Sequence, residues 1–311
     1  MKAVVLGATG FLGSNLVSEF IRRKIDTIAF CPKSDRARIM KDHGIEVIEG
    51  TFLDTKTLDF PLEEVDWLIH LASTTNPTES MLEPHKDAAN LTASSIIFQN
   101  AIDAGVSKIL FSSSGGTVYG DAGLGPVNES VGTRPVIPYA KTKLAIESEL
   151  IDLTDGTDTV PVILRFGNPY GPNQYPAKGT GVITAWLAAT RDDKPIIVYG
   201  DGENARDFFY VSDAIAAMTT ALESSRAKGI YNIGSGAATS LNGIIRIIEE
   251  ITHKKSSVMR LLERPSDTVK KIALDYARAQ KEFDWRPKIG LQEGITLTWR
   301  WVRSGEPFTI G

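Results

Sequence analysis

The sequence predicts an α/β fold built on a doubly wound parallel sheet. Short apolar runs alternate with amphipathic helical windows through the first half of the chain. Runs such as VVL and WLIHLA are apolar on both faces, as strands between two layers of helices must be. The chain has 311 residues, 42% hydrophobic and 23% charged, which suffices for one large domain or two closely packed ones.

The elements are expected in a regular order. Strands are predicted at 3–6, 27–30, 46–48, 67–71, 108–111 and 162–165, and helices at 12–23, 87–104 and 139–153. After Phe166 the pattern changes, because Gly and Pro cluster in GNPYGPNQYPAKGTG and a hairpin is expected over 195–211. We therefore expect one domain of residues 1–165 plus about 205–238, and a smaller C-terminal subdomain of residues 166–204 plus 239–311.

Composition excludes several function classes. A formal net charge of -4 and a pI near 5.7, with basic residues scattered, argue against nucleic-acid binding. The single Cys31 cannot form an intrachain disulfide, and no window of about eighteen apolar residues offers a membrane span. The glycine-interrupted opening lacks the cleavage pattern of a signal peptide. We expect a cytoplasmic chain with no membrane contact and no metal site.

The first motif is LGATGFLGSNL, between the first strand and the first helix. Gly7, Gly10 and Gly13 meet three needs: a tight turn, close approach of a pyrophosphate to the N–H groups at the helix start, and packing of helix on sheet. The helix start includes Phe11 and Leu12. The motif predicts a dinucleotide site in the larger domain, and its G-x-x-G-x-x-G spacing resembles that of the short-chain dehydrogenase/reductase superfamily.

The end of the second strand determines which dinucleotide fits. An acidic residue there would accept from a free ribose 2′-OH, but this chain has Cys31, Pro32 and Lys33, followed by Arg36 and Arg38. A cationic loop could take a 2′-phosphate, or these residues could form a solvated loop. NAD is expected, and NADP stays open.

Two polar phrases predict the chemistry. FSSSGGTVYG follows a buried strand, and PYAKTK places Tyr139 and Lys143 one helical turn apart. A tyrosine hydroxyl with its usual pKa of about 10 needs nearby positive charge to act as a base, and Lys143 together with a nicotinamide ring would supply it. Ser114 would then orient the substrate oxygen whose proton Tyr139 takes, whereas two interpretations stay open for Ser112 and Ser113: a part in this site, or satisfaction of strand-end backbone groups.

Nearly the whole chain resembles the extended short-chain dehydrogenases/reductases of the nucleotide-sugar epimerase/dehydratase family, which have a Rossmann domain. The matching phrases are GATGFLG, HLA, SSSGGTVYG, YAKTK, RFGNPYGP, GDGENARDFFYVSD, YNIGSG and RPSD. The resemblance implies that Leu71 and Ala72 lie against the cofactor and that Lys143 also holds its ribose. It further implies that Asn168, Arg206 and Arg264 bind the diphosphate of a nucleotide sugar. Two arginines can neutralise a pyrophosphate, although a surface hairpin and a capping loop would also account for these phrases.

Three function classes follow from the resemblance. The first is a nucleotide-sugar 4-epimerase that oxidises carbon 4 transiently with bound NAD. The second is an NADPH-dependent 4-keto-sugar reductase, and the third is a cofactor-binding regulator, which would be expected to have lost Tyr139 or Lys143. Sugar dehydratases of the family carry acids after the catalytic Ser or Thr, whereas this chain has Gly115 and Gly116, interpreted as open space for the sugar.

The resemblance also implies a homodimer. In relatives the helices that flank the fourth and fifth strands pair with those of a second copy in a four-helix bundle. The candidate contacts here are Ala88, Leu91, Ile96 and Ile97 on the first of these helices.

Overall fold

The computed structural model describes residues 1–54, 62–121, 123, 125–175, 181–306 and 308. Within these residues seven strands form one parallel sheet in the order β11-β6-β5-β4-β1-β2-β3. Its strands are β1 (Lys2–Leu6), β2 (Asp26–Cys31), β3 (Glu46–Glu49), β4 (Trp67–His70), β5 (Lys108–Ser114), β6 (Val160–Phe166) and β11 (Gly229–Ile233). The predicted doubly wound parallel sheet is therefore confirmed.

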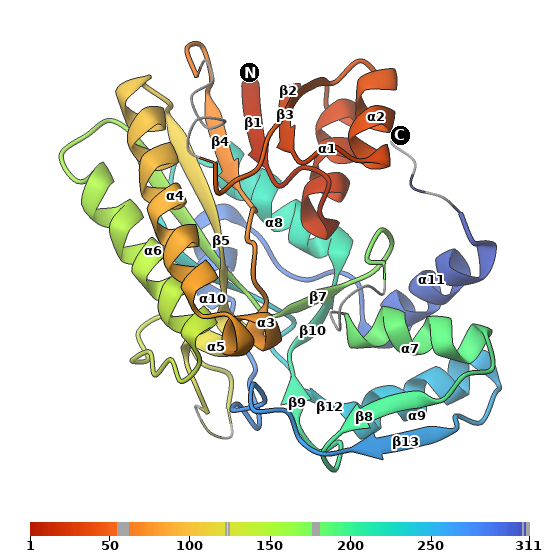
Figure 1. Ribbon diagram of the computed structural model, residues 1–311. Helices are drawn as coiled ribbons and strands as arrows, with labels where there is room; N and C mark the ends of the chain where they lie inside the picture. The colour runs from red at the N-terminus through yellow and green to blue at the C-terminus, as the bar shows by residue number, and fades with distance from the viewer. Residues whose placement is uncertain (55–61, 122, 124, 176–180, 307, 309–311) are drawn as a thin grey trace.

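Helices cover both faces of this sheet (Figure 1). The helices α1 (Phe11–Arg22) and α8 (Val211–Glu223) pack together on one face, while α4 (His85–Asp103) and α6 (Pro138–Thr154) pack together on the other. The remaining helices of this part are α2 (Asp35–Asp42), α3 (Pro77–Leu82) and α5 (Gly115–Val118). The buried strands read as continuous apolar runs because each contacts a helical layer on both sides.

The rest of the chain forms small sheets and helices, most of them below the main sheet in the view of Figure 1, whereas the helix of Ala277–Phe283 contacts β11 of the main sheet. Its strands are β7 (Asn168–Tyr170), β8 (Ile196–Tyr199), β9 (Ala205–Arg206), β10 (Phe208–Tyr210), β12 (Thr239–Ser240) and β13 (Val258–Leu261), and its helices are α7 (Val182–Arg191), α9 (Leu241–Thr252), α10 (Ala277–Phe283) and α11 (Leu291–Ser304). The division into the two predicted domains stays a prediction.

The hairpin predicted over 195–211 is wrong. The strand β8 pairs in parallel with β13, β9 pairs with β12, and β10 pairs with β7. The segment of Gly200 to Asn204 carries the turn residues of a hairpin, with positive φ at Gly200 and Gly202, but partners distant in sequence take both flanking strands. The turn was therefore predicted correctly from its residues. The pairing of its flanking strands was not, because it depends on residues far away in the sequence.

The polar end of β5 also differs from expectation. The strand was predicted to stop before the serines, yet it continues through Ser114, because Ser112 to Ser114 pair in register with Leu164 to Phe166 of β6. The helix α5 begins directly afterwards at Gly115. The three serines therefore have the rigid geometry of a central strand.

A buried carboxylate joins the small sheets to the main sheet. Asp207, between β9 and β10, is fully buried and accepts from the amides of Ser235 at 2.6 Å and Leu274 at 2.9 Å. Its carbonyl accepts from the amide of Asn168 at 2.7 Å. Ser235 lies just beyond β11, so this junction fixes β9 and β10 to the edge of the main sheet.

Two further expectations concern surfaces. Ile97, a candidate contact between copies, is fully buried in the core beneath α4, so that residue is excluded as an interface contact. Ala88 is exposed, and Leu91 and Ile96 are half-buried. Among the residues described, no helix is long and apolar enough to cross a membrane.

Candidate active site

The glycine turn between β1 and α1 has the shape of a dinucleotide cradle. Gly7 has a φ of +81°, and a Cβ there would lie 3.0 Å from the amide nitrogen of Ala72. A Cβ on Gly13 would lie 2.8 Å from Ala8 Cα and closer still to the carbonyl oxygen of Gly7. The N-cap Gly10 provides no side-chain cap and the first turn of α1 carries no acid. The first N–H groups of α1 are thus available to an anion, and the residues fit a pyrophosphate.

The turn after β4 lies against this cradle. The amide of Leu71 donates to the carbonyl of Leu6 at 3.0 Å, which continues the sheet by one residue. The backbone of Leu71 and Ala72 forms the surface that Gly7 faces.

The three cationic residues that follow β2 lie in different environments. Lys33 is exposed, and Arg38 pairs with Asp35 at 3.4 Å on the surface. Arg36 instead donates to the carbonyls of Thr9 at 2.8 Å and Asn173 at 3.1 Å. Its guanidinium also lies over the rings of Tyr175 and Phe308, 4.6 and 5.0 Å from their centroids. Arg36 is therefore engaged with protein groups, and Lys33 is the freer cation of this loop.

The predicted catalytic residues meet at the polar end of β5. The helix α6 begins at Pro138, a residue that the first turn of a helix tolerates. Tyr139 and Lys143 lie one turn apart on the face of α6 that is directed toward β5. Lys143 Nζ donates to the carbonyl of Ser112 at 2.9 Å and lies 5.7 Å from the ring centroid of Tyr139. Tyr139 is in hydrogen-bonding contact with Ser114, whose hydroxyl accepts from Thr117 Oγ1 at 3.0 Å.

The pKa values of the pair move in opposite directions. Burial, reinforced by the charge of Asp87, raises the pKa of Tyr139 to about 12, although the hydrogen bond with Ser114 acts to lower it. Burial lowers the pKa of Lys143 to about 8, against the opposing effects of Glu147 and Asp87. Burial therefore dominates the pKa of Tyr139, because the buried phenolate is the costlier form, and the combined effect of Lys143 and a nicotinamide ring stays a prediction.

The two glycines after Ser114 have different surroundings. A Cβ on Gly115 would lie 2.6 Å from Leu274 Cδ1 and 3.0 Å from the carbonyl oxygen of Arg165, so this position is closely packed. The interpretation of Gly115 as open space for the sugar is wrong. Gly116 is less closely packed, since a Cβ there would lie 3.3 Å from Asn168 Oδ1. It lines a cavity of about 730 Å³ that Ser114 and Tyr139 also line.

A cavity of about 730 Å³ brings the candidate cofactor and substrate residues together. Phe11, Leu12, Ser114, Tyr139, Asn168, Arg206 and Arg264 all line it. The volume is that of a small-molecule site. Asp267 is the one acid among the described lining residues, and it lies beside the two arginines rather than beside Ser114.

The two arginines that line this cavity can bind an anion. Arg264 stacks on the ring of Tyr199, 3.7 Å from the centroid, and Arg206 donates to the carbonyl of Ala205 at 3.1 Å. Within the described part of the chain neither guanidinium forms an ion pair with a carboxylate. Burial lowers the pKa of Arg206, the sign of a charge held away from water. The buried Oδ1 of Asn168 also has no hydrogen-bond partner among the residues described. Unpaired cations and an orphan acceptor in one cavity indicate a polar, anionic ligand.

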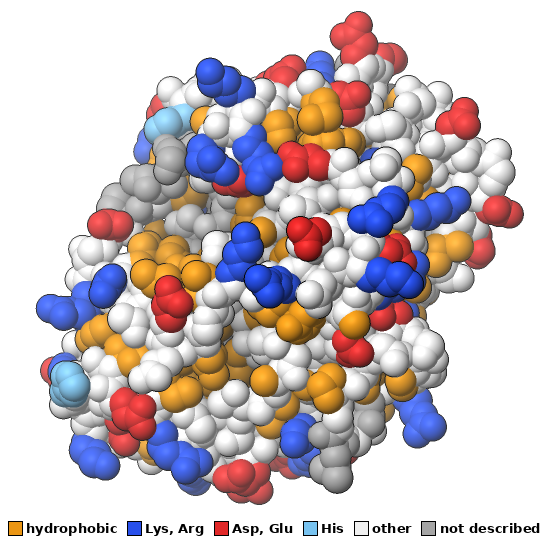
Figure 2. Space-filling view, turned by 180° about the vertical axis from the view of Figure 1, so that it is seen from behind, with side chains coloured by type: hydrophobic (Ala, Val, Ile, Leu, Met, Phe, Trp, Pro, Cys, Tyr) orange, Lys and Arg blue, Asp and Glu red, His pale blue; other side chains and the backbone are white. Residues whose placement is uncertain are grey.

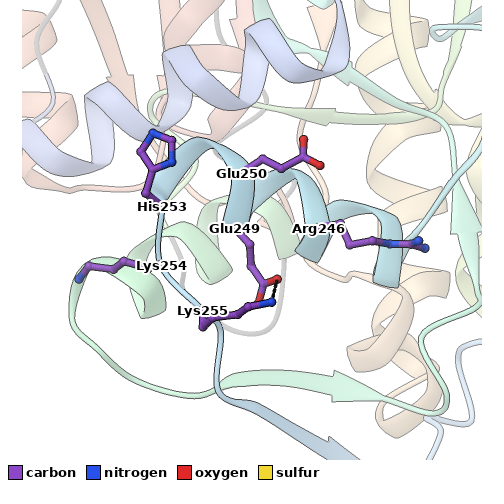
Figure 3. A pocket seen from close by; sticks show the side chains of 6 residues that line it. All are labelled: Arg246, Glu249, Glu250, His253, Lys254 and Lys255. Atoms are coloured by element: carbon purple, nitrogen blue, oxygen red, sulfur yellow. Dashed lines mark ion pairs between the residues drawn. The ribbon is translucent and has the colours of Figure 1, made fainter.

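A second hollow lies on the surface at the end of α9 (Figure 3). It is lined by Arg246, Glu249, Glu250, His253, Lys254 and Lys255. Part of its charge is paired within the protein, since Lys255 pairs with Glu249 at 3.7 Å and Lys254 pairs with Asp193 at 2.7 Å. On the face in Figure 2, basic and acidic side chains are interspersed. Among the described residues no cluster of His, Cys, Asp and Glu could hold a metal.

The sequence analysis did not identify several buried polar residues near the site. Asp87 accepts from Thr75 Oγ1 at 2.7 Å and from Ser80 Oγ, and it raises the pKa of both Tyr139 and Lys143. Glu147 pairs with Arg165 below the serines. An acid one helical turn after Lys143 was the available signal for Glu147, and an arginine inside an apolar strand was the signal for Arg165.

Known proteins resemble this chain over nearly its whole length. The model of the NAD dependent epimerase/dehydratase family matches residues 3–234. The dTDP-4-dehydro-6-deoxyglucose reductase of Escherichia coli is 32% identical over 301 residues, covering 94% of each chain. The UDP-glucose 4-epimerase of Thermotoga maritima, solved with UDP-glucose, is 29% identical with a TM-score of 0.92, covering 98% of this chain and 99% of that one. The Thermus thermophilus UDP-glucose 4-epimerase, solved with NAD, is 28% identical with a TM-score of 0.91, covering 98% and 100%.

The fold and the site thus define a dinucleotide-dependent enzyme. The chain belongs to the NAD dependent epimerase/dehydratase family, and its cofactor is NAD. The glycine cradle, the turn of Leu71 and Ala72, and Lys143 are the residues that fit this cofactor.

Proposed function

We propose that this enzyme is a nucleotide-sugar 4-epimerase. The single observation that carries the proposal is one cavity that is lined both by the Ser114–Tyr139 pair and by two arginines that form no ion pair with any carboxylate the structure describes. A hexose linked to a nucleoside diphosphate has the matching groups, because its diphosphate carries two negative charges and its carbon 4 bears an ionisable hydroxyl. The similar epimerases named above, one of them solved with UDP-glucose, support this substrate class.

The residues have distinct roles in this proposal. Arg206, Arg264 and Asn168 hold the diphosphate, and Ser114 donates to the oxygen on carbon 4. Tyr139 removes the proton of that hydroxyl and later returns it. Bound NAD supplies a hydride acceptor and a positively charged ring that favours the tyrosinate. Lys143 holds the cofactor ribose and keeps a positive charge near the site.

Dehydration is not expected of this site. Elimination of a hydroxide needs a general acid, worth about 10²–10⁴-fold in rate. Gly115 and Gly116 carry none, and the described cavity wall has its acid, Asp267, beside the arginines. The ketone formed at carbon 4 is therefore expected to be reduced again.

A second candidate is an NADPH-dependent 4-keto-sugar reductase. It is favoured by the 32% identical reductase and by the exposed Lys33 at the end of β2, where an acid would mark NAD. The binding residues would be the same, and Tyr139, with its pKa near 12, would act as the acid.

One experiment tests both candidates. UDP-glucose, UDP-galactose and their N-acetyl forms are incubated with the enzyme in heavy water, without added cofactor, and followed by NMR. We expect a pair of carbon 4 epimers to interconvert with no deuterium in the sugar. Tyr139→Phe is the control for contaminating activity and should show no turnover.

Other products would contradict the epimerase. A 4-keto product with deuterium at carbon 6 would indicate a dehydratase. Turnover only in a parallel incubation of a nucleotide 4-keto sugar with NADPH would indicate the reductase.

We further propose a cytoplasmic homodimer that pairs α4 and α6 with those of a second copy. The exposed Ala88 and the half-buried Leu91 and Ile96 of α4 are the remaining candidate contacts. Both helices lie side by side at the outer face of the sheet, as a four-helix bundle requires (Figure 1).

A further inference from the structure

A buried ion pair lies directly beneath the catalytic residues. Glu147 follows Lys143 by one turn on α6, and its carboxylate accepts from Arg165 Nε at 3.0 Å and Nη2 at 2.6 Å. The two side chains are 3% and 5% exposed. Desolvation cancels much of the attraction in such a pair, so a net gain in stability does not account for it. Its connections to the site suggest another role.

The carboxylate of Glu147 is also fastened to β5. Ser113 Oγ donates to Glu147 Oε1. The carboxylate of Glu147 therefore holds Ser113 in place. Ser113 lies between Ser112, whose carbonyl accepts from Lys143, and Ser114, which contacts Tyr139.

Arg165 extends the network to the other side of Ser114. Its Nη1 donates to Tyr119 Oη at 2.9 Å, and Tyr119 donates to Asn232 Oδ1 at 2.8 Å. Tyr119 is the C-cap of α5, the helix that begins directly after Ser114, and Asn232 lies on β11. The polar end of β5 is thus held from α6, from β6 and from the end of α5.

The charge of Glu147 also acts on Lys143. The ionisable groups around Lys143 are Glu147 and Tyr139 on its own helix, Asp87 on α4 and His70 at the end of β4. Burial lowers the pKa of His70 to about 3, so it is neutral, and Tyr139 is neutral as well. Glu147 and Asp87 are therefore the charges that oppose deprotonation of Lys143.

We propose that Glu147, held by Arg165 and bonded to Ser113, is a positioning residue that sets the distance between the end of β5 and α6. It thereby fixes Ser114 relative to Tyr139 and keeps Lys143 charged at neutral pH. The proposal rests on the proposed function for the roles of Ser114, Tyr139 and Lys143, and it adds a group that does not touch the substrate.

Two variants separate the effects of position and charge. Ser113→Ala removes the bond to β5 and leaves the ion pair intact. We expect kcat to fall about 10-fold with KM for the nucleotide sugar changed by less than about 3-fold, because only the alignment of the reacting groups is disturbed. Asp152→Asn changes an exposed position on α6, the helix that carries Glu147, and serves as the control. It should leave kcat and KM unchanged.

The double variant Glu147→Gln/Arg165→Gln removes both charges without leaving one unpaired. In it the pKa of Lys143, followed by NMR of the ¹⁵N-labelled side chain in the free protein, should fall by about half a unit or more. The alkaline limb of the kcat profile should move to lower pH by the same amount.

Several results would overturn the inference. They are an unchanged kcat in Ser113→Ala, or an unchanged Lys143 pKa in a folded double variant. If the double variant does not fold, Ser113→Ala decides alone. If the wild-type protein converts none of the nucleotide sugars, the proposed function fails, and the pKa of Lys143 in the free variants still tests the inference.

Discussion

The cofactor cradle can be tested by adding one methyl group to Gly13. Its Cβ would lie 2.8 Å from Ala8 Cα and 2.9 Å from Ala8 O, where ordinary contact begins at 3.4 Å. The obstructing atoms are backbone, which has no rotamer to change. The turn must therefore move by at least about 0.5 Å away from the first turn of α1 in Gly13→Ala.

The size of the effect follows from the contacts that this turn makes. Overpacking of this kind costs about 1–3 kcal/mol of folding stability. The turn also aims backbone N–H groups at a pyrophosphate, and a hydrogen bond to a charged group contributes about 1.5–3 kcal/mol. Loss of one such bond corresponds to about 10- to 100-fold in Kd. We expect NAD affinity to fall by this factor while the affinity for a nucleoside diphosphate, held by Arg206 and Arg264, changes little.

The assay is calorimetric titration of cofactor-free protein with NAD, and separately with UDP. Gly132→Ala is the matched control, because a Cβ at Gly132 meets nothing within 4 Å. If Gly13→Ala binds NAD as tightly as Gly132→Ala, the cradle does not contact the cofactor. If both ligands weaken equally, the substitution has acted through global unfolding rather than through the cradle.

Three further predictions concern Lys143, Arg206 and assembly. The folded-state pKa of Lys143, about 8, lies below its usual 10.5. The unfolded chain therefore binds more protons between these values and stability rises with pH across that window. Lys143→Met should abolish turnover, remove this rise and increase Tm near pH 7 by about 2–4 °C, as pH-dependent calorimetry would show; an unchanged pH profile would contradict it. Arg206→Met should raise KM for the nucleotide sugar about 10- to 100-fold with no loss of Tm, because the guanidinium has no carboxylate partner among the described residues; an unaltered KM would exclude a role in binding. Light scattering at micromolar concentration should give the mass of a dimer, and a monomer mass would refute the pairing of α4 and α6.

The strands β1 to β6 of the main sheet and the helices α1, α4 and α6 were predictable because each is determined locally. Alternating buried runs and amphipathic windows gave the strands within about three residues of β1 to β6, and Pro138 marked the start of α6. The glycine turn was equally local, since its residues are close in sequence and each has a steric reason to be glycine.

The predictions that failed depended on contacts between distant residues. The segment around Gly202 has hairpin chemistry, but β8 pairs with a strand about sixty residues further on. Gly115 is closely packed because of Leu274, far along the chain. The pKa of Tyr139 follows from burial and from Asp87, neither of which a Tyr-x-x-x-Lys spacing reveals.

The buried Asp207 has a consequence for how long a substrate must be. It follows Arg206 in sequence, and its carboxylate and carbonyl tie this stretch to Ser235, Leu274 and Asn168. The backbone at Arg206 is therefore anchored to the same sheet that carries Ser114, which limits how far the two residues can approach each other around a shorter ligand. A hexose on a single phosphate that reaches Tyr139 would leave Arg206 without its anion. We expect the enzyme to reject sugar monophosphates by length alone, with no residue dedicated to excluding them.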